Sequence, residues 1–403
     1  MIEIKDKKDC CGCAACVQIC PKACISLVED TEGFLYPHVD RNSCIGCGLC
    51  EKVCPIINAG EPREPLRCYA AKNRDERIRM ESSSGGVFTL LAESIIDEGG
   101  IVFGARFDDK WEVVHDFTET KAGLAAFRGS KYVQSRIGNT FRQAESFLKE
   151  GRKVLFSGTP CQIKGLKLYL RRDYDNLLAV DFICHGVPSP GVWRQYLDET
   201  FRTPDRREGR GKNSVLSSSK DIPVITGISF RDKKLGWKKF SFVVRGKSAG
   251  QAGKNSVLLS DMHQNNVYMK AFLSDLILRP SCYGCRAKGG RSGSDITIAD
   301  FWGIQNIMPD FDDDKGVSLV LVNKKEIFPD LVSKGIECIE SDIEKPKLYN
   351  AGFSSHIRVH PGREKFFDRV SETGFIVLVN SVLKKSILTR IMNKVKFKIK
   401  SMI

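Results

Sequence analysis

The stretch "CCGCAACVQICP" at residues 10–21 holds five cysteines, and "CIGCGLCEKVCP" at residues 44–55 repeats its spacing. In each run, three cysteines are separated by two residues, and a fourth follows after three more residues, just before a proline. Three thiolates at this spacing wrap one loop around three corners of an iron–sulfur cube, and the fourth reaches a neighbouring cube. Zinc sites use paired cysteines instead of three in series. The two runs therefore predict two 4Fe–4S clusters.

This segment resembles bacterial two-cluster ferredoxins over about 55 residues. Cys11 and Cys24 fall outside the pattern and are expected to be small packing residues. Residues 32–44 predict a hairpin of short strands between the runs, and each run is expected to open a short helix. The resemblance implies two sets of cluster ligands: Cys10, Cys13, Cys16 and Cys54 for one 4Fe–4S cluster, and Cys44, Cys47, Cys50 and Cys20 for the other.

The composition of the 403-residue chain, 42% hydrophobic and 28% charged, is ordinary for a soluble protein with two or three domains. No stretch has the roughly 18 to 20 apolar residues that a transmembrane helix needs, and the N-terminus does not read as a secretory signal. We therefore expect a cytoplasmic protein, in which clustered cysteines serve metal binding or redox chemistry. The net charge of +14 suggests nucleic acid. However, aromatic residues accompany basic ones only at 236–242, so no nucleic-acid partner is expected.

Beyond a linker at 58–66, the chain alternates apolar strands with helical segments, which predicts an α/β (α+β) fold with a large mixed sheet. Two apolar strands run into turns that carry Cys161 and Cys184, and functional groups in such sheets gather at the carboxyl ends of strands. Together with the pair Cys282 and Cys285, these thiols would complete a third 4Fe–4S cluster. A zinc site at the pair, or buried free thiols at the two turns, are the alternatives. We interpret the remaining cysteines as structural: Cys68 and Cys338.

The segment "ESSSGG" at 81–86 lies just before a predicted helix. Backbone N–H groups at a helix N-terminus suit a phosphate, although a plain serine cap with a glycine turn fits the same residues. We divide the chain into a ferredoxin-type domain, two parts of a larger body and a basic tail: residues 1–60, 67–150, 151–350 and 374–403.

Motifs spread in order through the body resemble the beta subunit of coenzyme F420 (deazaflavin) hydrogenase and dehydrogenase, from about residue 67 to 350. They are "ESSSGGVFTLLA", "GSKYVQS", "SGTPCQIKGL", "ICHGVPSP", "FRDKKLGWKKFSF" and "CYGCRAKGGRSGSDITIADFWG". The fused ferredoxin makes the chain look most similar to members found in bacterial polysaccharide gene clusters. Members carry FAD and iron–sulfur clusters, and the resemblance implies flavin contacts at Ser83, Ser84, Gly85, Gly86, Thr89, Lys131 and Tyr132.

The resemblance implies an oxidoreductase that passes electrons between 4Fe–4S clusters and FAD, to or from an organic substrate or a deazaflavin-type coenzyme. His185 is the candidate proton donor, and a hydrogen-bonded structural histidine is the alternative. The competing function is a non-enzymatic electron-transfer subunit that serves a separate dehydrogenase or hydrogenase. The expected partner is accordingly a redox protein or a small-molecule substrate.

The tail at 374–403 has seven cationic residues, no acidic ones and apolar residues at helical spacing. This pattern fits a basic amphipathic helix in peripheral contact with an anionic membrane. It fits equally well a terminal helix that docks on the body.

Overall fold

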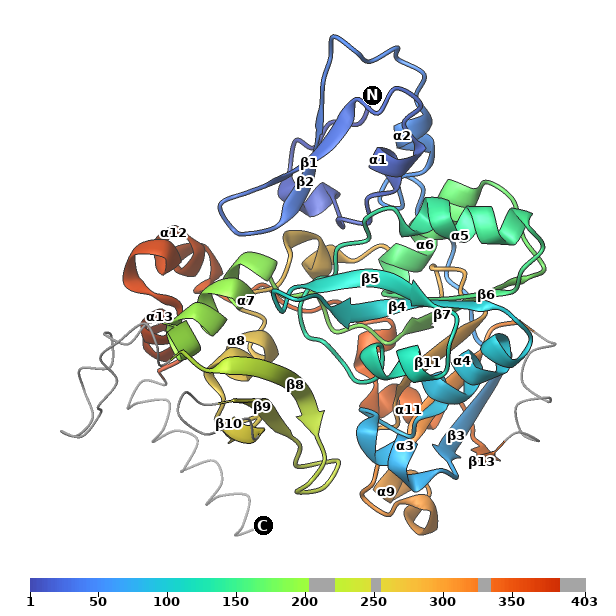
Figure 1. Cartoon of the computed structure of the whole chain (residues 1–403), viewed down its shortest axis with the longest axis vertical. Helices are drawn as coiled ribbons and strands as arrows, with labels where there is room; N and C mark the ends of the chain where they lie inside the picture. Colours follow the sequence, from blue (N-terminus) through green and yellow to red (C-terminus); the bar gives the residue numbers. More distant parts are fainter. Residues whose placement is uncertain (203–221, 248–254, 325–334, 385–403) are drawn as a thin grey trace.

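The computed structural model describes residues 1–202, 222–247, 255–324 and 335–384. It has a small N-terminal unit (residues 1–60), a central eight-stranded mixed sheet with helices, and a lobe built on a three-stranded sheet (Figure 1). The predicted α/β class, with a ferredoxin-type unit and a larger mixed-sheet body, is confirmed. The predicted tail lies outside the described residues from 385 onward.

The N-terminal unit follows the internal repeat of its two cysteine runs. In each run a glycine with positive φ, Gly12 or Gly46, precedes the second cysteine, and Ala14 or Gly48, also at positive φ, leads into a short helix. These left-handed residues turn the chain tightly, so that the thiols of one run face a common point. The unit contains η1 (Lys7–Asp9), α1 (Ala15–Ile19), the antiparallel pair β1 (Ile25–Glu29) and β2 (Leu35–Val39), and α2 (Leu49–Lys52).

The central sheet has the strand order β13-β3-β12-β11-β7-β6-β4-β5. Its four middle strands β11, β7, β6 and β4 are parallel, and the outer strands pair antiparallel. Both faces of the middle strands are buried, which explains why they read as continuous apolar runs. The strands are β3 (Arg67–Asn73), β4 (Ile101–Phe107), β5 (Val113–Thr118), β6 (Val154–Ser157), β7 (Leu177–Phe182), β11 (Ile296–Asp300), β12 (Ser318–Val322) and β13 (Ile336–Glu340).

Successive residues of these strands point to opposite faces, as the pleat requires. On one face Phe103 and Phe156 pack against α5 and α6, and the N-terminal unit lies on the outer side of these helices (Figure 1). On the other face Val102 and Leu155 pack against α4. The helices around the sheet are α3 (Glu76–Glu81), α4 (Val87–Asp97), η2 (Ala122–Ala126), α5 (Thr140–Lys149), α6 (Pro160–Leu170), α9 (Ile304–Ile307), η5 (Pro309–Phe311), α11 (Glu344–Tyr349) and η6 (Ala351–Phe353).

The lobe has its own aromatic core, in which Trp193, Phe230 and Tyr268 are almost completely buried. The first part of the predicted tail docks there, because Phe375 and Val379 are buried in this core. Among the described residues, no helix is long and apolar enough to cross a bilayer. The lobe contains β8 (Val224–Asp232), β9 (Ser241–Lys247), β10 (Ser256–Met262), α7 (Pro190–Leu197), the π-helical turn η3 (Asp198–Arg202), α8 (Val267–Leu273), η4 (Pro280–Gly284), α12 (Arg363–Thr373) and α13 (Phe375–Val382).

Candidate functional site

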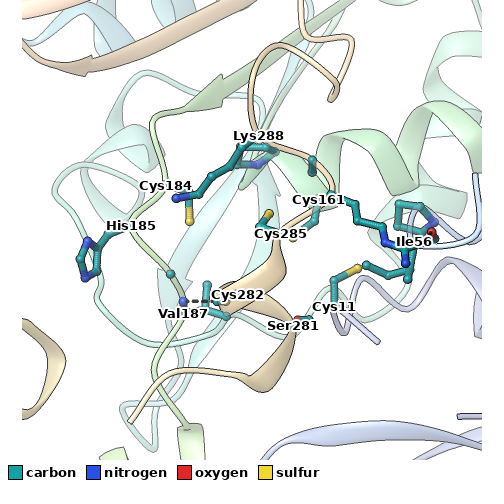
Figure 2. Close-up of a pocket in the computed structure, with 15 residues that line it drawn as sticks. Cys11, Ile56, Cys161, Cys184, His185, Val187, Ser281, Cys282, Cys285 and Lys288 are labelled. Atoms are coloured by element: carbon teal, nitrogen blue, oxygen red, sulfur yellow. Dashed lines mark hydrogen bonds between the residues drawn. The ribbon is translucent and has the colours of Figure 1, made fainter. Parts of the chain in front are cut away.

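The four cysteines that the sequence predicted to converge in the body line one cavity, here called the thiol cavity (Figure 2). Cys161 lies in the first turn of α6, directly after β6, and Cys184 follows the neighbouring parallel strand β7. Cys282 lies in η4 and Cys285 follows it, ahead of β11, which pairs with β7. The carboxyl ends of adjacent parallel strands therefore bring these thiols together.

Hydrogen-bond donors and one cation surround the thiols of this cavity. The cavity has a volume of about 30 Å³ and is partly open to solvent. The Val187 N–H donates to Cys282 Sγ at 3.4 Å, and the Thr159 hydroxyl lies 3.2 Å from Cys161 Sγ. Burial raises the pKa of Cys184 well above its usual range, the neighbouring thiols of the cavity add to the rise, and the cation of Lys288 only partly offsets it.

The same geometry bears on the zinc alternative. Zinc draws its thiolates to about 2.3 Å from a single ion, whereas a cube holds them at separate corners. Within the described part of the chain, no three cysteine, histidine or carboxylate side chains are placed to bind a single metal ion. Cys282 and Cys285 share one cavity with Cys161 and Cys184.

Cys11 also lines the thiol cavity, although it comes from the N-terminal unit. The sequence suggested only a packing role for it. The side chain is indeed buried, at 7% exposure, and it lines this cavity together with Cys161. One signal in the sequence could have marked it, because the internal repeat has Ile45 in the corresponding place.

Several cysteines of the N-terminal unit lie near one another, and their proposed ligand sets stay predictions. Burial raises the pKa of Cys16 to about 12, and the nearby Cys10 and Cys54 add to this rise. Cys13 is also close, since the charges of Cys16 and Cys10 raise its pKa. The second run lines a separate pocket, and the end of the first run and the residues that follow it line this pocket as well. The thiols in this pocket are those of Cys20, Cys24, Cys44, Cys47 and Cys50.

A buried arginine of the body, Arg279, holds the first cysteine run in place. Its guanidinium donates to the backbone oxygens of Cys10 at 2.7 Å and Leu35 at 2.9 Å, and to Gln134 Oε1 at 3.0 Å. It also stacks over the ring of Tyr36, with 4.3 Å to the centroid. The side chain is fully buried, so these contacts fix the position of the N-terminal unit on the body. Neither Arg279 nor the glutamine was singled out in the sequence, because no spacing marks them.

The residues expected to contact the flavin divide into two groups. Ser83 and Lys131 line a second cavity of about 240 Å³, here called the basic cavity, together with Arg128, Arg231 and the carboxylate of Glu81. Arg128 forms an ion pair with Glu81, and burial lowers the pKa of Lys131 to about 7, so this lysine is only partly charged at neutral pH. The two arginines and the Ser83 hydroxyl are groups that can bind a phosphate or another anion.

The other expected flavin contacts are engaged with the protein itself. The Ser84 hydroxyl donates to Val317 O at 2.8 Å, and the Gly85 N–H donates to the Ser318 hydroxyl at 3.0 Å. A Cβ at Gly85 would collide with the Ala71 carbonyl oxygen. Gly86 is the cap of α4 at φ 83°, and Thr89 is buried and accepts a bond from Arg128. These residues shape the start of α4 and do not line the basic cavity.

A row of aromatic rings joins the two cavities. The His185 ring, at the thiol cavity, lies 5.2 Å from Phe272, which stacks on Tyr132 at 4.6 Å. Tyr132 lies 5.5 Å from Phe230, which lines the basic cavity. The Tyr132 hydroxyl also accepts a bond from Arg231, at 3.1 Å. The two cavities are therefore neighbours within one packed core.

His185, the predicted proton donor, forms a hydrogen bond with Asp275. Its Nε2 lies 2.6 Å from Asp275 Oδ1, and its imidazole points away from the thiols (Figure 2). Asp275 has a positive φ of 62°, an uncommon conformation for a residue other than glycine. Its backbone oxygen accepts a bond from the Tyr283 hydroxyl at 2.5 Å, so this strained turn is held from two sides.

The chain matches models of known protein families over most of its length. Residues 9–57 match the family model for 4Fe–4S dicluster domains. Residues 68–141 and 151–346 match the models for the N-terminal and C-terminal parts of the coenzyme F420 hydrogenase/dehydrogenase beta subunit, which together span more than half of the chain. The chain belongs to this family. The resemblance read from its motifs is thereby confirmed.

Two further comparisons were made. A solved structure of the F420-reducing [NiFe] hydrogenase complex from Methanosarcina barkeri, derivatised with xenon, has a chain that is 17% identical. The match covers 80% of this chain and 90% of that one, with a TM-score of 0.42. No curated protein matches the chain. Family membership and the dicluster domain make this beta-subunit-type chain an iron–sulfur redox protein that takes part in electron transfer.

Proposed function

We propose that this beta-subunit-type chain is an iron–sulfur flavoprotein oxidoreductase with three 4Fe–4S clusters and one FAD. The observation that carries the proposal is the thiol cavity, where Cys161, Cys184, Cys282 and Cys285 come together from three separate segments. Thiolates are the usual ligands of iron–sulfur clusters. When bound, such clusters carry single electrons, and a flavin exchanges one-electron for two-electron transfer with a substrate.

Twelve cysteines would hold the three clusters. Eight belong to the N-terminal unit and four to the body. The grouping of Cys20 with the second run supports the crossed pattern of the two-cluster ferredoxins. The proposed ligands are Cys10, Cys13, Cys16 and Cys54; Cys20, Cys44, Cys47 and Cys50; and Cys161, Cys184, Cys282 and Cys285.

The basic cavity is the proposed site of the anionic part of FAD. Arg231 supports this, because it lines the cavity and its buried Nε has no hydrogen-bond partner among the described residues. The same guanidinium forms two bonds to Asp300, at 2.9 and 3.1 Å, which hold it in one orientation. Ser83 and Lys131 would contact the flavin phosphates. Tyr132 would hold the flavin ring system close to the thiol cavity. Ser84, Gly85, Gly86 and Thr89 would act indirectly, by shaping the start of α4.

His185 is proposed to hold a proton for the substrate. Asp275 orients its imidazole, and the side chain is 41% exposed, so a small molecule can reach it. A purely structural histidine remains the competing reading. His185→Gln keeps a hydrogen-bonding group of similar size, so loss of the pH dependence of turnover with unchanged FAD content would support the proton role. Full turnover with an unchanged pH profile would remove His185 from the mechanism.

The first test is the content of iron, zinc and FAD per chain, measured on protein purified without oxygen. About twelve irons and one FAD are expected, because each cube holds four irons. About eight irons, one zinc and no flavin would overturn the proposal. In a matched pair of variants, Cys161→Ser with Cys184→Ser is expected to lose about four irons. By contrast, Cys68→Ser with Cys338→Ser is expected to retain all of them, since both lie outside the thiol cavity.

The second candidate function is an electron-transfer subunit without a substrate of its own. The family description favours it, because it names a beta subunit of hydrogenases and dehydrogenases. Turnover of an organic acceptor or of a deazaflavin by the isolated chain, with dithionite as donor, would exclude it. Use of a deazaflavin, a role in polysaccharide biosynthesis, a cytoplasmic location and contact of the tail with a membrane stay predictions.

A further inference from the structure

Four cationic side chains from three separate segments form a patch beside the thiol cavity, here called the cationic patch. Two of them are one turn apart on α6, where residues three positions apart lie on the same face. The linker after the N-terminal unit and the segment before β11 supply the other two. One member is exposed and three are half-buried. The members are Arg63, Lys164, Lys167 and Arg291.

Close backbone contacts bring these three segments together. The Arg63 N–H donates to Gly289 O at 3.0 Å, which ties the linker to the segment before β11. A Cβ at Gly60 would lie 2.7 Å from Arg291 O and 3.1 Å from Lys164 Nζ. Glycine at this crossing therefore lets the linker lie against both the segment before β11 and the ammonium group on α6.

The patch has more positive charge than nearby carboxylates neutralise. Within the described part of the chain, its one ion pair joins Lys167 Nζ to Asp295 Oδ1, at 3.7 Å. Asp295 is buried and also accepts a backbone N–H. Glu61, two residues before Arg63, is exposed, and cations still exceed carboxylates when both acids are counted. Burial lowers the pKa of Lys164, and the charges of Arg63 and Lys167 lower it further. The cations thus repel one another, and their field suits a partner of opposite charge.

The same three segments also line the thiol cavity. α6 contributes Cys161, one turn before Lys164, and the end of the N-terminal unit contributes Ile56 (Figure 2). The segment before β11 contributes Lys288, three residues before Arg291. A protein that docks on the cationic patch would therefore come close to the proposed cluster site of the body.

We propose that the cationic patch is the docking surface of an acidic electron-transfer protein. The inference rests on the proposed function, because it presupposes a redox centre in the thiol cavity. Complexes of redox proteins have small interfaces, and opposite charges steer their association. One electron moves between partner and chain, so that one is oxidised and the other reduced, and no bond forms or breaks. A nucleic acid would need aromatic side chains among the cations, whereas Arg291 lies in the glycine-rich segment 289–293.

The test measures association of the full chain, purified without oxygen, with a reduced acidic two-cluster ferredoxin, by surface plasmon resonance at a series of salt concentrations. Arg63→Glu with Lys164→Glu is expected to lower the association rate about tenfold or more and to flatten its dependence on salt. Arg63→Gln with Lys164→Gln removes the charges without reversing them and is expected to show a smaller loss. Neither residue forms an ion pair among the described residues, so the midpoint of urea unfolding is expected to stay at or above that of wild type.

Lys22→Glu with Lys52→Glu is the matched control, since it changes the net charge by the same amount. Both lysines are exposed and lie at the second cysteine run, which is the rival docking position. This variant is expected to associate at the wild-type rate. An equal loss in both pairs, or a loss in the control alone, would overturn the inference.

Two further outcomes would also overturn the docking surface. One is a wild-type chain that does not bind the ferredoxin. The other is patch-dependent binding of a single-stranded oligonucleotide in place of the ferredoxin. If such a chain contains about twelve irons, the inference fails and the proposed function stands. About eight irons in the wild-type chain would overturn the proposed function and, with it, electron transfer at this patch.

Discussion

Arg279 shows how much of the assembly depends on one side chain. Arg279→Met keeps the length of the side chain but removes the donors to Cys10 O, Leu35 O and Gln134 Oε1. A buried polar group left without its partner costs about 1–3 kcal/mol. We therefore expect the free energy of unfolding to fall by about 3 kcal/mol or more, measured by anaerobic urea unfolding followed by cluster absorbance.

Arg286→Met is the control for this prediction. Arg286 is exposed and makes a single bond to the N-terminal unit, to Ile56 O at 3.0 Å. Its loss is expected to cost less than about 1 kcal/mol, since an exposed group can bond to water instead. Equal effects of the two substitutions would show that Arg279 does not hold the N-terminal unit in the way the contacts indicate.

The buried carboxyl group of Asp181 is expected to make the stability of the folded chain depend on pH. It is buried, which raises its pKa to about 6, although hydroxyl donors from Ser292, Ser294 and Thr297 partly offset the rise. Because the folded pKa lies above the unfolded value of about 4, the folded chain binds the proton more tightly. This stabilisation is complete below about pH 4, is lost as the pH rises through about 6, and amounts to about 3 kcal/mol.

The variant that isolates this effect is Asp181→Asn, which cannot titrate. Its stability relative to wild type is expected to increase between pH 4 and pH 8 by about 3 kcal/mol, as measured by urea unfolding at a series of pH values. Parallel stability curves for the two proteins would mean that Asp181 has an ordinary pKa in the folded chain.

Some of these residues could be recognised from the sequence, and others could not. The cysteines could be found because thiolates on a cube need a regular local spacing. Arg279 and Gln134 could not, because each acts on residues more than one hundred positions away and nothing local distinguishes them from other polar residues. The unusual position of Cys11 could have been recognised from the internal repeat, but its burial depends on how the N-terminal unit docks on the body.

Among the elements, the turn between β8 and β9 acts as a clamp on the segment before α4. Lys233 Nζ donates to the backbone oxygens of Arg79, Ser84 and Lys315, at 2.6 to 2.9 Å. Lys233→Met removes these donors and loosens the segment that carries Ser83. We expect FAD affinity to fall about tenfold, equivalent to about 1.4 kcal/mol, measured by fluorescence titration of flavin-free protein.

Lys234→Met provides a close control, because Lys234 is the next residue but is exposed. The affinity of this variant for FAD is expected to match wild type. A similar loss in both variants would mean that the overall positive charge of the turn attracts the flavin, and that the clamp plays no part.

The elements themselves were largely predictable, and their arrangement less so. Apolar runs predicted the parallel strands. By contrast, residues 32–44 were wrongly expected to hold both strands of a hairpin, because they contain only β2 and the first strand, β1, is Ile25–Glu29. The order of the strands in the sheet could not be predicted from the sequence. β11 pairs with β7 across more than one hundred residues, and such non-local pairing leaves no local pattern.

At the scale of the whole molecule, the N-terminal unit is built into the body. Its residues share a core with Phe141 and Phe156, and Arg279 binds it from below. The sequence suggested two domains joined by a linker at 58–66, because composition changes there. Burial across the junction depends on side chains from both sides, so it could not be read from either one. The stability of the two parts should consequently be linked.

The linkage predicts what removal of iron does to the body. The Gln18 side chain of the N-terminal unit accepts bonds from the N–H groups of Phe141 and Arg142, at 3.0 and 3.3 Å, and so caps the start of α5. Small metal domains unfold when their metal is removed, which would take this cap away. After anaerobic chelation, hydrogen exchange measured by mass spectrometry is therefore expected to rise in residues 140–149 as well as in 9–57.

The control lies in the lobe, where α8 is capped from within by Asn266, which accepts from the Met269 N–H at 3.1 Å. Exchange in α8 is expected to stay unchanged. Gln18→Leu, with its clusters intact, is expected to raise exchange at the start of α5 alone, because it removes the cap and leaves the fold of the N-terminal unit in place. If residues 140–149 stay protected after chelation while 9–57 exchange freely, the two parts are stable independently, and the contacts at Gln18 and Arg279 contribute little to holding them together.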